Sequence, residues 1–311
     1  MSTVTIGVVA RDRFSTAGRS LRRLIEVTPK PFRLVIVDAG TPRRYRVEME
    51  RAVAGHPDVE FLRAAEYLNP NAARNWVVRE TPDGEFLVLM ENDNLVSQGW
   101  LHALIRASDE EPADVARPLL YESRLSRRFP HFDDRWDGIE TIEGSAGPAY
   151  RFSPRQTPLS TDIGAPRRRT RALETHCLLF RRAVFQQIAP FDERINTRQE
   201  LDIALQLHAA GIPVVFEPAS VVTYISPPPV RRDEREFFHF RWDYEAAVRS
   251  HRIIEEKWGT LNLPGSLSFV RHRRQFVSYA RYACFVLGWE MPRFLRAKAY
   301  ALAASLRGKA D

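Results

Sequence analysis

Cysteine and long apolar runs are scarce in this 311-residue sequence. The two cysteines, Cys177 and Cys284, are too few and too far apart for a disulfide framework or a thiolate metal site. We expect both to be reduced and buried. No run of about 18 apolar residues occurs, so no transmembrane helix is predicted. The opening MSTVTIGVVARDRF lacks a basic segment before its apolar run, which argues against a signal peptide and favours a cytoplasmic protein.

Lysine is also rare, because all but four of the 46 basic residues are arginine. Arginine suits bidentate phosphate binding, but a GC-rich coding sequence produces the same bias, and both explanations stay open. The net charge of +7 permits anionic partners, namely nucleotides, nucleic acid or a membrane surface. The basic residues are dispersed, without zinc-ligand spacing or an RNA-binding signature, so we expect no nucleic-acid partner.

The first part of the chain alternates strand and helix patterns. Strands are predicted over 4–10, 32–40, 59–64 and 85–90, and helical patterns lie between them. This alternation predicts an α/β fold with a mostly parallel sheet and helices on both faces. Ligands of such sheets bind outside the carboxyl ends of the strands. Asp38 and the run Glu91-Asn92-Asp93-Asn94 fall at such ends.

Residues 122–172 are rich in Arg, Pro, Gly and Ser and show little periodicity. We expect an irregular functional loop there, or else a flexible solvated loop. Order returns with a strand and a helix over 174–193, a helix over 199–210 and a strand over 212–218.

The triple proline at 227–229 ends this organisation. We expect one domain over 1–228 and a helical C-terminal extension over 229–311. The last predicted helix mixes aromatic and basic residues, among them Trp289, Arg293 and Phe294. Such a helix can lie on an anionic membrane surface, dock on the main domain or pair in a homodimer, and the sequence leaves these alternatives open.

Two pairs of carboxylates carry the candidate chemistry. Glu91 and Asp93, two apart at a strand end, can both reach one hard cation, although acidic residues also cap turns. Glu200 and Asp202 lie near a predicted helix N-terminus, where carboxylates are stabilised. Residues two apart do not share a helix face. We therefore expect only one of this second pair to point into a site.

Taken in order, these segments resemble the family 2 glycosyltransferases, which have the GT-A fold. The resemblance covers roughly residues 4–225. It is carried by VTIGVVA, VIVDAGTP, NPNAARN, GEFLVLMEND, a following Gly-Trp-Leu, LLFRRAVFQQIAPFDE and QELDIALQLHAAG. Each segment alone is a weak signal, but their order and spacing together are specific.

The resemblance implies an inverting, metal-dependent transfer of a sugar from a nucleotide-diphosphate donor to an acceptor hydroxyl. It implies that Glu91 and Asp93 hold Mn²⁺ or Mg²⁺ on the diphosphate. Glu200 is the first candidate for the catalytic base and Asp202 the second. The implied donor-binding residues are Ala10, Arg11, Asp38, Arg74, Asn75 and Asn92, and the implied sugar and acceptor residues are His176, Asp192, Glu193 and Trp100. The acceptor can be a small molecule, a lipid-linked molecule or a polysaccharide. Under the same resemblance, residues 122–172 form a lid or acceptor-binding loop, or else a flexible solvated loop. Its arginines 167–169 are then candidates for contacting the donor diphosphate or a phosphate-bearing acceptor.

Three positions depart from the family pattern. Tyr224 stands where the family often has a metal-binding His, and Glu91 and Gln199 replace other usual acids. A transferase-like protein with lost or metal-independent activity is therefore an alternative. Another is a sugar-1-phosphate nucleotidyltransferase, but that class needs a Gly-rich loop containing Arg and Lys after its first strand. The segment ARDRFSTAGRS has one late Gly and no Lys.

Overall fold

A ten-stranded sheet forms the centre of the protein. The computed structural model describes residues 4–285, except 125–126, 132–135, 145–146, 157–161, 227–229, 261–262 and 264–266. It also describes a few positions beyond 285. The strand order is β10-β12-β6-β11-β4-β1-β2-β3, with β5 paired to β12 and β7 to β6. The strands are β1 (Val4–Val9), β2 (Arg33–Ala39), β3 (Val59–Ala64), β4 (Phe86–Glu91), β5 (Asn94–Val96), β6 (Val115–Arg124), β7 (Arg127–Pro130), β10 (Arg168–Thr170), β11 (Cys177–Arg181) and β12 (Val214–Ile225).

The predicted mostly parallel α/β sheet is confirmed. Strands β1, β2, β3 and β4 run parallel to one another, and β6 runs parallel to β12. Strand β11 lies antiparallel between β4 and β6. Strand β12 continues past the predicted end at 218 to Ile225, through an irregularity between Glu217 and Val221.

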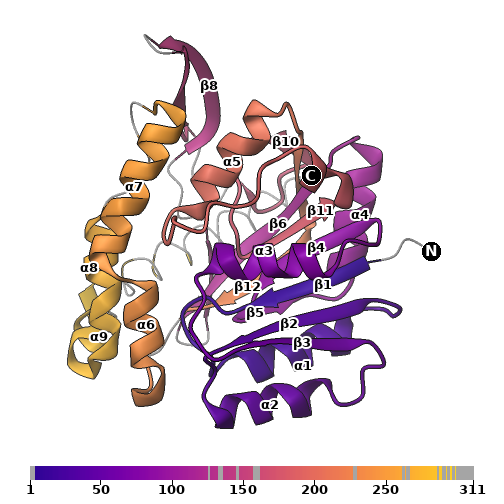
Figure 1. The fold of residues 1–311 in the computed structure, drawn as a ribbon, viewed down its shortest axis with the longest axis vertical. Coiled ribbons are helices and arrows are strands. Elements are labelled where there is room, and N and C mark those ends of the chain that lie inside the picture. Colours follow the sequence, from indigo (N-terminus) through magenta and orange to yellow (C-terminus); the bar gives the residue numbers. More distant parts are fainter. Residues whose placement is uncertain are drawn as a thin grey trace.

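Helices cover both faces of the sheet (Figure 1). The side chains of α1 (Ala17–Val27), α2 (Arg43–Val53) and α4 (Trp100–Glu110) form one apolar core with the sheet. Those of α3 (Pro70–Glu80) and α5 (Gln199–Ala209) share the other core. Helix α3 starts where predicted, because the Asn69 side chain accepts the Ala72 N–H and Pro70 occupies the first turn. It packs so closely on β1 that a Cβ on Gly7 would lie 2.5 Å from Val77 Cγ1.

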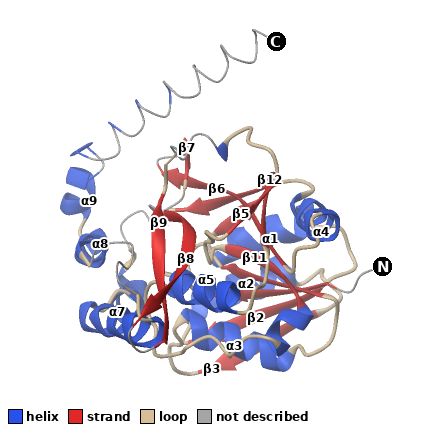
Figure 2. Cartoon of the chain, turned by 90° about the horizontal axis from the view of Figure 1, so that it is seen from above, coloured by secondary structure: helices blue, strands red, loops and turns tan. Residues whose placement is uncertain are grey.

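The prediction of an irregular segment over 122–172 is wrong for much of its length. Strands β8 (Trp136–Gly144) and β9 (Gly147–Pro154) form a separate hairpin, which stands beside helix α7 (Tyr244–Trp258) (Figure 2). The hairpin pairs with itself and buries only a few side chains in the core, chiefly Trp136, Ile139 and Phe152. This sparse burial leaves little periodicity in the sequence. Between residues 174 and 193, a 3₁₀ segment, η2 (Arg182–Gln186), stands in place of the predicted helix.

The arginines at 167–169 are engaged at the β10 edge of the sheet rather than with the candidate site. Arg167 pairs with Glu110 and Glu217, and Arg168 pairs with Asp162. The Arg169 side chain donates to the Glu111 carbonyl. These contacts do not support the expectation that this run binds a donor diphosphate.

In the described part of the chain after the triple proline, the α-helices are α6 (Arg235–Arg241), α7 (Tyr244–Trp258), α8 (Ser268–Arg273) and α9 (Tyr279–Phe285). Helices α6 to α8 lie beside the carboxyl ends of β1 and its neighbours (Figure 1). Phe237 stacks on Phe14 with ring centroids 4.5 Å apart. The Glu234 carboxylate accepts the N–H groups of Phe14 and Ser15, both at 2.7 Å. The helices therefore pack on the turn after β1, and the division at 228/229 stays a prediction.

Cys177 is buried in β11, as expected, but Cys284 is exposed. The expectation for Cys284 is therefore wrong, because α9 turns that side chain to solvent. Trp289, Arg293 and Phe294 lie outside the described residues, so the predicted amphipathic tail is not placed. Within the described residues, none of the helices is long and apolar enough to span a bilayer.

Candidate active site

Glu91 ends β4 in the middle of a buried charged cluster. Its side chain accepts the Arg74 Nη2–H at 2.8 Å on Oε1. Its Oε2 lies 2.9 Å from Nδ1 of His176 and 3.3 Å from Nε of Arg11. Burial acts to raise the pKa of Glu91, but Arg11, His176 and Arg74 together hold the pKa below its usual range. Glu91 is therefore a carboxylate at neutral pH.

Asp93, two residues later, is fully buried and differently surrounded. Neither of its carboxylate oxygens has a hydrogen-bond partner among the described residues. Burial raises the pKa of Asp93 to about 7, and the like charges of Glu91 and Asp12 add to this effect against Arg11. An acid left in this state is suited to receive a cationic ligand.

Glu91, Asp93 and His176 fit a divalent cation. One ligand atom from each lies within 4.8 Å of the others. Burial and the neighbouring Arg11 lower the pKa of His176 to about 3, so its ring is neutral and can act as a ligand. Two carboxylates with one imidazole suit Mn²⁺ or Mg²⁺, with the imidazole favouring manganese.

Tyr224, from β12, does not reach this set as a free ligand. Its hydroxyl is shared with Asp12, at 3.4 Å, and with Arg273. Burial raises the pKa of Tyr224, which keeps the phenol neutral. Its ring lies 4.5 Å from the His176 ring, and the Arg11 guanidinium sits over it, also at 4.5 Å. Tyr224 therefore forms one wall of the cluster.

The turn after β1 is fixed by the amide of Asn92. Its Oδ1 accepts the Arg11 N–H at 3.3 Å and its Nδ2 donates to the Arg13 carbonyl at 2.8 Å. Ala10, in the same turn, packs against the Phe14 and Phe237 aromatic cluster. Asn92 thus acts by positioning Arg11 against Glu91, and Ala10 lies at the start of this turn.

Asp38 lies at the end of β2, where the sequence predicts it. It is fully buried, with Arg46 Nε 2.8 Å and Arg63 Nε 4.0 Å from its Oδ2. Among the described residues, no hydrogen bond or ion pair joins Asp38 to the Glu91 cluster. Its place in donor binding remains a prediction.

The acids of the Phe-Asp-Glu segment are held by α3. Asn75 donates to the Phe191 carbonyl at 2.8 Å and to Glu193 at 2.9 Å, so Asn75 anchors this loop instead of facing the cluster. Asp192 pairs with Arg194 at 2.7 Å. The roles of Asp192 and Glu193 at an acceptor stay predictions.

Trp100 requires a correction. The structure does not bring it to the site but buries it completely in the core under α4. Its indole N–H donates to Thr28 Oγ1 at 2.9 Å. Gly99, with φ of 74°, turns the chain at the start of α4. The buried indole cannot contact an acceptor in this arrangement.

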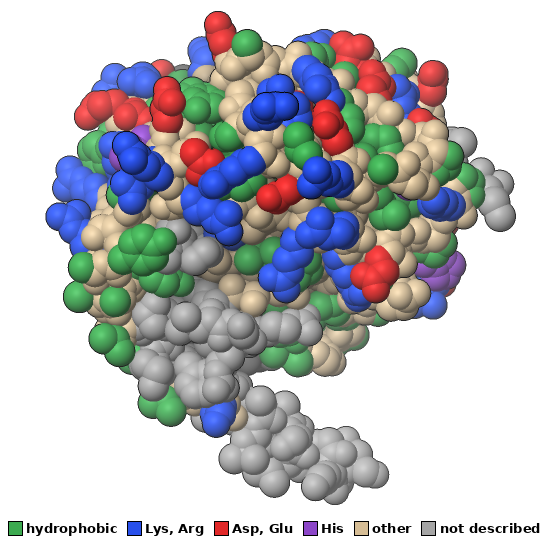
Figure 3. Space-filling view, turned by 90° about the horizontal axis from the view of Figure 1, so that it is seen from below, with side chains coloured by type: hydrophobic (Ala, Val, Ile, Leu, Met, Phe, Trp, Pro, Cys, Tyr) green, Lys and Arg blue, Asp and Glu red, His purple; other side chains and the backbone are tan. Residues whose placement is uncertain are grey.

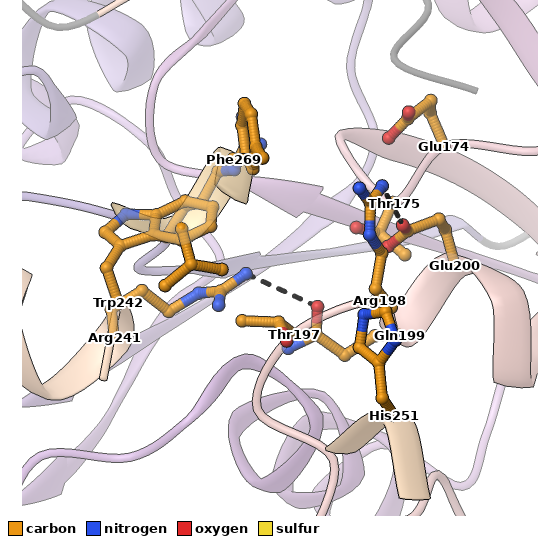
Figure 4. Close-up of a pocket in the computed structure, with 12 residues that line it drawn as sticks. Glu174, Thr175, Thr197, Arg198, Gln199, Glu200, Arg241, Trp242, His251 and Phe269 are labelled. Atoms are coloured by element: carbon orange, nitrogen blue, oxygen red, sulfur yellow. Dashed lines mark hydrogen bonds and ion pairs between the residues drawn. The ribbon is translucent and has the colours of Figure 1, made fainter. Parts of the chain in front are cut away.

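Glu200 lines a pocket beside the charged cluster, whereas Asp202 does not. Arg198, immediately before α5, has a positive φ of 64°, a strained conformation for a non-glycine residue. Figure 4 shows its guanidinium directed toward Glu200, at 3.5 Å. Asp202 instead accepts from Lys257 Nζ at 2.8 Å and Trp258 Nε1 at 2.7 Å. As expected from their spacing, only one of the two acids faces the pocket.

Residues before and after the triple proline at 227–229 line this pocket. It is narrow, with a cavity volume of about 40 Å³. A small-molecule ligand pocket encloses roughly 300 Å³ or more, so this cavity is smaller than a small-molecule site. Thr175 links it to the cluster, because its Oγ1 lies 3.3 Å from Glu91. The lining residues are Arg11, Glu174, Thr175, Thr197, Arg198, Gln199, Glu200, Arg241, Trp242, His251, Phe269 and Val270.

Several residues of the site were missed by the sequence interpretation. Asp12 accepts from Arg273 at 2.8 Å and from Trp242 Nε1 at 3.0 Å. His131 lies with its Nε2 3.2 Å from Nε2 of His176. Asp12 directly follows Arg11, so the polar turn was a usable signal for it. Arg273 ends α8 and Trp242 directly follows α6, both far along the chain, in a region whose sequence pattern gives no sign of a site.

A second and larger cavity, of about 630 Å³, lies between the β8–β9 hairpin and the far end of α5. Asp137, Arg171 and His208 are among its lining residues. Of the residues predicted to contact a ligand, only Arg169 is among its described lining residues. On the face viewed in Figure 3, basic and acidic side chains are interspersed.

Structural neighbours support the fold. The chain is similar to the structure of GalNAc-T7 with UDP, GalNAc and Mn²⁺, with a TM-score of 0.57 and 15% identity over 88% of this chain and 55% of that one. It is also similar to the mannosyltransferase PcManGT from Pyrobaculum calidifontis in complex with GDP-Man and Mn²⁺. That match has a TM-score of 0.54 and 12% identity over 98% and 81% of the two chains. At these identities the likeness concerns the fold.

Sequence relatives point the same way. A pre-mycofactocin glycosyltransferase of Mycobacterium tuberculosis is 22% identical over 71% of this chain and 42% of its own length. The O-antigen biosynthesis protein RfbC of Myxococcus xanthus is 29% identical over 47% of this chain and 11% of its own length. The chain thus spans less than half the length of these relatives. The profile of glycosyl transferase family 2 matches residues 5–188, more than half of the chain, and the protein therefore belongs to glycosyl transferase family 2.

Proposed function

We propose that this chain is an inverting, metal-supported glycosyltransferase that moves a sugar from a nucleoside-diphosphate donor to an acceptor hydroxyl. The proposal rests on two acids with different surroundings, Asp93 and Glu200. Asp93 is buried and without a hydrogen-bond partner among the described residues, in the cation-binding set with Glu91. Glu200 lines the adjoining pocket, which Arg11 and Thr175 connect to Glu91.

The charged residues suit the leaving group of such a transfer. As the bond between the anomeric carbon and the diphosphate breaks, negative charge develops on the phosphate oxygens. Arg11, whose guanidinium borders the pocket, is placed to stabilise that charge. Asp93, Glu91 and His176 would hold a divalent cation, which when bound screens the diphosphate charge. GalNAc-T7 and PcManGT, with Mn²⁺ in their structures, support this assignment.

Glu200 has the position required of the base. A new bond forms between the acceptor oxygen and the anomeric carbon while a carboxylate accepts the hydroxyl proton. Attack from the face opposite the leaving group inverts the anomeric configuration, and a single carboxylate away from the cation then suffices. Glu200 lies in the pocket, and among the described residues its one hydrogen-bonding contact is the longer 3.5 Å contact to Arg198, which leaves its oxygens able to approach an acceptor. A small molecule, a lipid-linked molecule or a polysaccharide remains an equally open acceptor.

The test is a thermal-shift panel of UDP, GDP, TDP and CMP, each with Mn²⁺ and with EDTA. A ligand that binds only the folded state raises its stability by mass action. We expect one nucleoside diphosphate to raise Tm, more strongly with Mn²⁺, and Asp93→Ala to remove the manganese-dependent part. Asp83→Ala, which changes an exposed acid, is the matched control and should behave as the unaltered protein. No shift with any nucleotide would contradict the proposal, and a shift unaffected by Asp93→Ala would remove the cation assignment.

A donor that binds without turnover would instead identify a transferase-like protein with lost activity. This second candidate is favoured by Tyr224, which stands where the family often has a metal-binding His and whose hydroxyl is hydrogen-bonded to Asp12. An assay of donor hydrolysis or sugar transfer, monitored by release of the nucleoside diphosphate, distinguishes an active transferase from a transferase-like protein with lost activity.

A further inference from the structure

Arg273 reaches the candidate active site from outside the part of the chain that the family profile matches. It ends α8, and its side chain is 3% exposed. Its Nη2 lies 2.8 Å from Asp12 Oδ2 and also contacts the Tyr224 hydroxyl. Its Nε is buried and has no hydrogen-bond partner in the described part of the chain. A guanidinium placed in this way still has a donor to offer.

Other buried arginines around the cluster are also incompletely used. Nε and Nη1 of Arg13 and Nε of Arg241 have no partner among the described residues. A buried N–H group without a partner is costly and uncommon, so several in one place call for an explanation. An anion with several oxygen acceptors would satisfy them.

The charges in the cluster point to the same conclusion. The cluster consists of Asp12, Glu91 and Asp93 and the charged residues that contact them or interact with them electrostatically. Five arginines surround these three acids: the buried Arg13, Arg74, Arg241 and Arg273, and Arg11, whose side chain is 12% exposed. Glu200 adds an acid, but it is paired with Arg198. The cluster thus contains more cations than anions, and uncompensated buried charge is unfavourable.

We propose that Arg273 is a diphosphate-binding residue that the C-terminal helices contribute to the site. With Arg11 it forms a seat for the diphosphate of the donor, on the Tyr224 side of the cluster. This inference rests on the proposed function and assigns a further residue to it. The seat binds a diphosphate through guanidinium groups even where no divalent cation is present.

The competing explanation is a purely structural one. Arg273 would then serve only to dock α8 on Asp12, beside Trp242, whose ring centroid lies 5.3 Å from the guanidinium carbon. Both explanations predict lower stability when Arg273 is replaced. Only the first predicts weaker binding of a diphosphate by protein that remains folded.

The experiment is a calorimetric titration of the full chain in EDTA with inorganic pyrophosphate and with the nucleoside diphosphate that gives a thermal shift. The variants are Arg273→Met, Arg273→Lys and the control Arg271→Met. Arg271 is an exposed arginine of the same helix. We expect the unaltered protein to bind both ligands without metal. Arg273→Met should weaken binding about tenfold or more, since charge-assisted hydrogen bonds are lost, while Arg271→Met should not.

Each outcome decides the matter. Equal affinities for the unaltered protein and Arg273→Met, even with a lowered Tm, would overturn the inference and leave the structural role. Should Arg273→Met fail to fold, Arg273→Lys decides, because it keeps a positive charge but loses the guanidinium fork; undiminished affinity would count against us. If the unaltered protein binds a nucleoside diphosphate only with Mn²⁺, this inference fails while the proposed function stands. Binding under neither condition overturns both.

Discussion

The Arg11 guanidinium lies between Glu91 and Tyr224, with its Nε 3.3 Å from Glu91 Oε2 and its central carbon 4.5 Å from the Tyr224 ring centroid. This one side chain joins the turn after β1 to the ends of β4 and β12. Its Nη1 also lies 2.8 Å from Nε2 of His176. Burial opposes the charge of Arg11, but the surrounding acids and Tyr224 raise its pKa well above the usual value. A permanent positive charge therefore stands beside the predicted cation ligands.

Glu200→Gln tests the base. Glutamine keeps the size of the side chain but cannot accept the hydroxyl proton, so we expect turnover to fall by about 10²-fold or more. The affinity for the donor should change little. Glu200 lines the pocket beside Arg198, and among the described residues no hydrogen bond or ion pair joins it to Glu91 or Asp93. The rate of nucleoside-diphosphate release and the affinity for the donor are both measured on the variant. Glu256→Gln, an exposed change on α7, is the control. Full activity in Glu200→Gln would move the base elsewhere.

Asp202→Asn separates a structural acid from a catalytic one. Asp202 is fully buried and accepts from Lys257 and Trp258. Removing its charge should lower the free energy of unfolding by about 1–3 kcal/mol, while turnover of the folded enzyme is retained. Denaturant unfolding with activity measured on the same samples checks this.

Lys257→Met removes the other partner of the Asp202 ion pair. It should cost less than Asp202→Asn, because the Lys257 side chain is 28% exposed and its loss leaves a buried acid that keeps Trp258 and Gln206 as donors. The double variant should be less destabilised than the sum of the two single ones. A collapse of turnover in Asp202→Asn at unchanged stability would make Asp202 the base and Glu200 the structural acid.

The sheet and the acids at its carboxyl edge could be predicted from sequence, because each depends on local signals. Apolar strands ended by Asp38 and by Glu91 to Asp93 show in a single window of the chain. Helix α3 carries its own start signal in Asn69-Pro70. The spacing of Glu200 and Asp202 was enough to predict that only one of them faces the pocket, since helix geometry fixes directions two residues apart.

The rest depends on contacts between distant segments. Arg273 meets Asp12 only because α8 packs beside the turn after β1, and nothing in the sequence near either residue encodes that approach. Trp100 was misjudged for the opposite reason, because an aromatic residue close to a predicted site is equally compatible with a core position. The β8–β9 hairpin was missed because its pairing is internal and its buried side chains are few.

His251 gives the protein a predicted pH dependence. It lines the pocket from α7, and burial together with Arg198 lowers its pKa to about 4. In the unfolded chain its pKa is near 6.5, so between pH 6.5 and 4 the unfolded state binds more protons than the folded state. Stability is therefore complete above pH 6.5 and falls as the pH is lowered through this range.

We expect His251→Asn to reduce the loss of stability between pH 8 and pH 5 by about 1 kcal/mol, a value discounted because solvent partly screens this side chain. Urea unfolding at the two pH values measures it, with His102→Asn, an exposed change on α4, as the control. A bound donor places negative charge in the same pocket and favours the protonated imidazole, so saturating nucleoside diphosphate should shrink the pH dependence of the unaltered protein. An identical pH dependence in the unaltered protein and His251→Asn would show that His251 takes up its proton as readily in the folded pocket as in the unfolded chain.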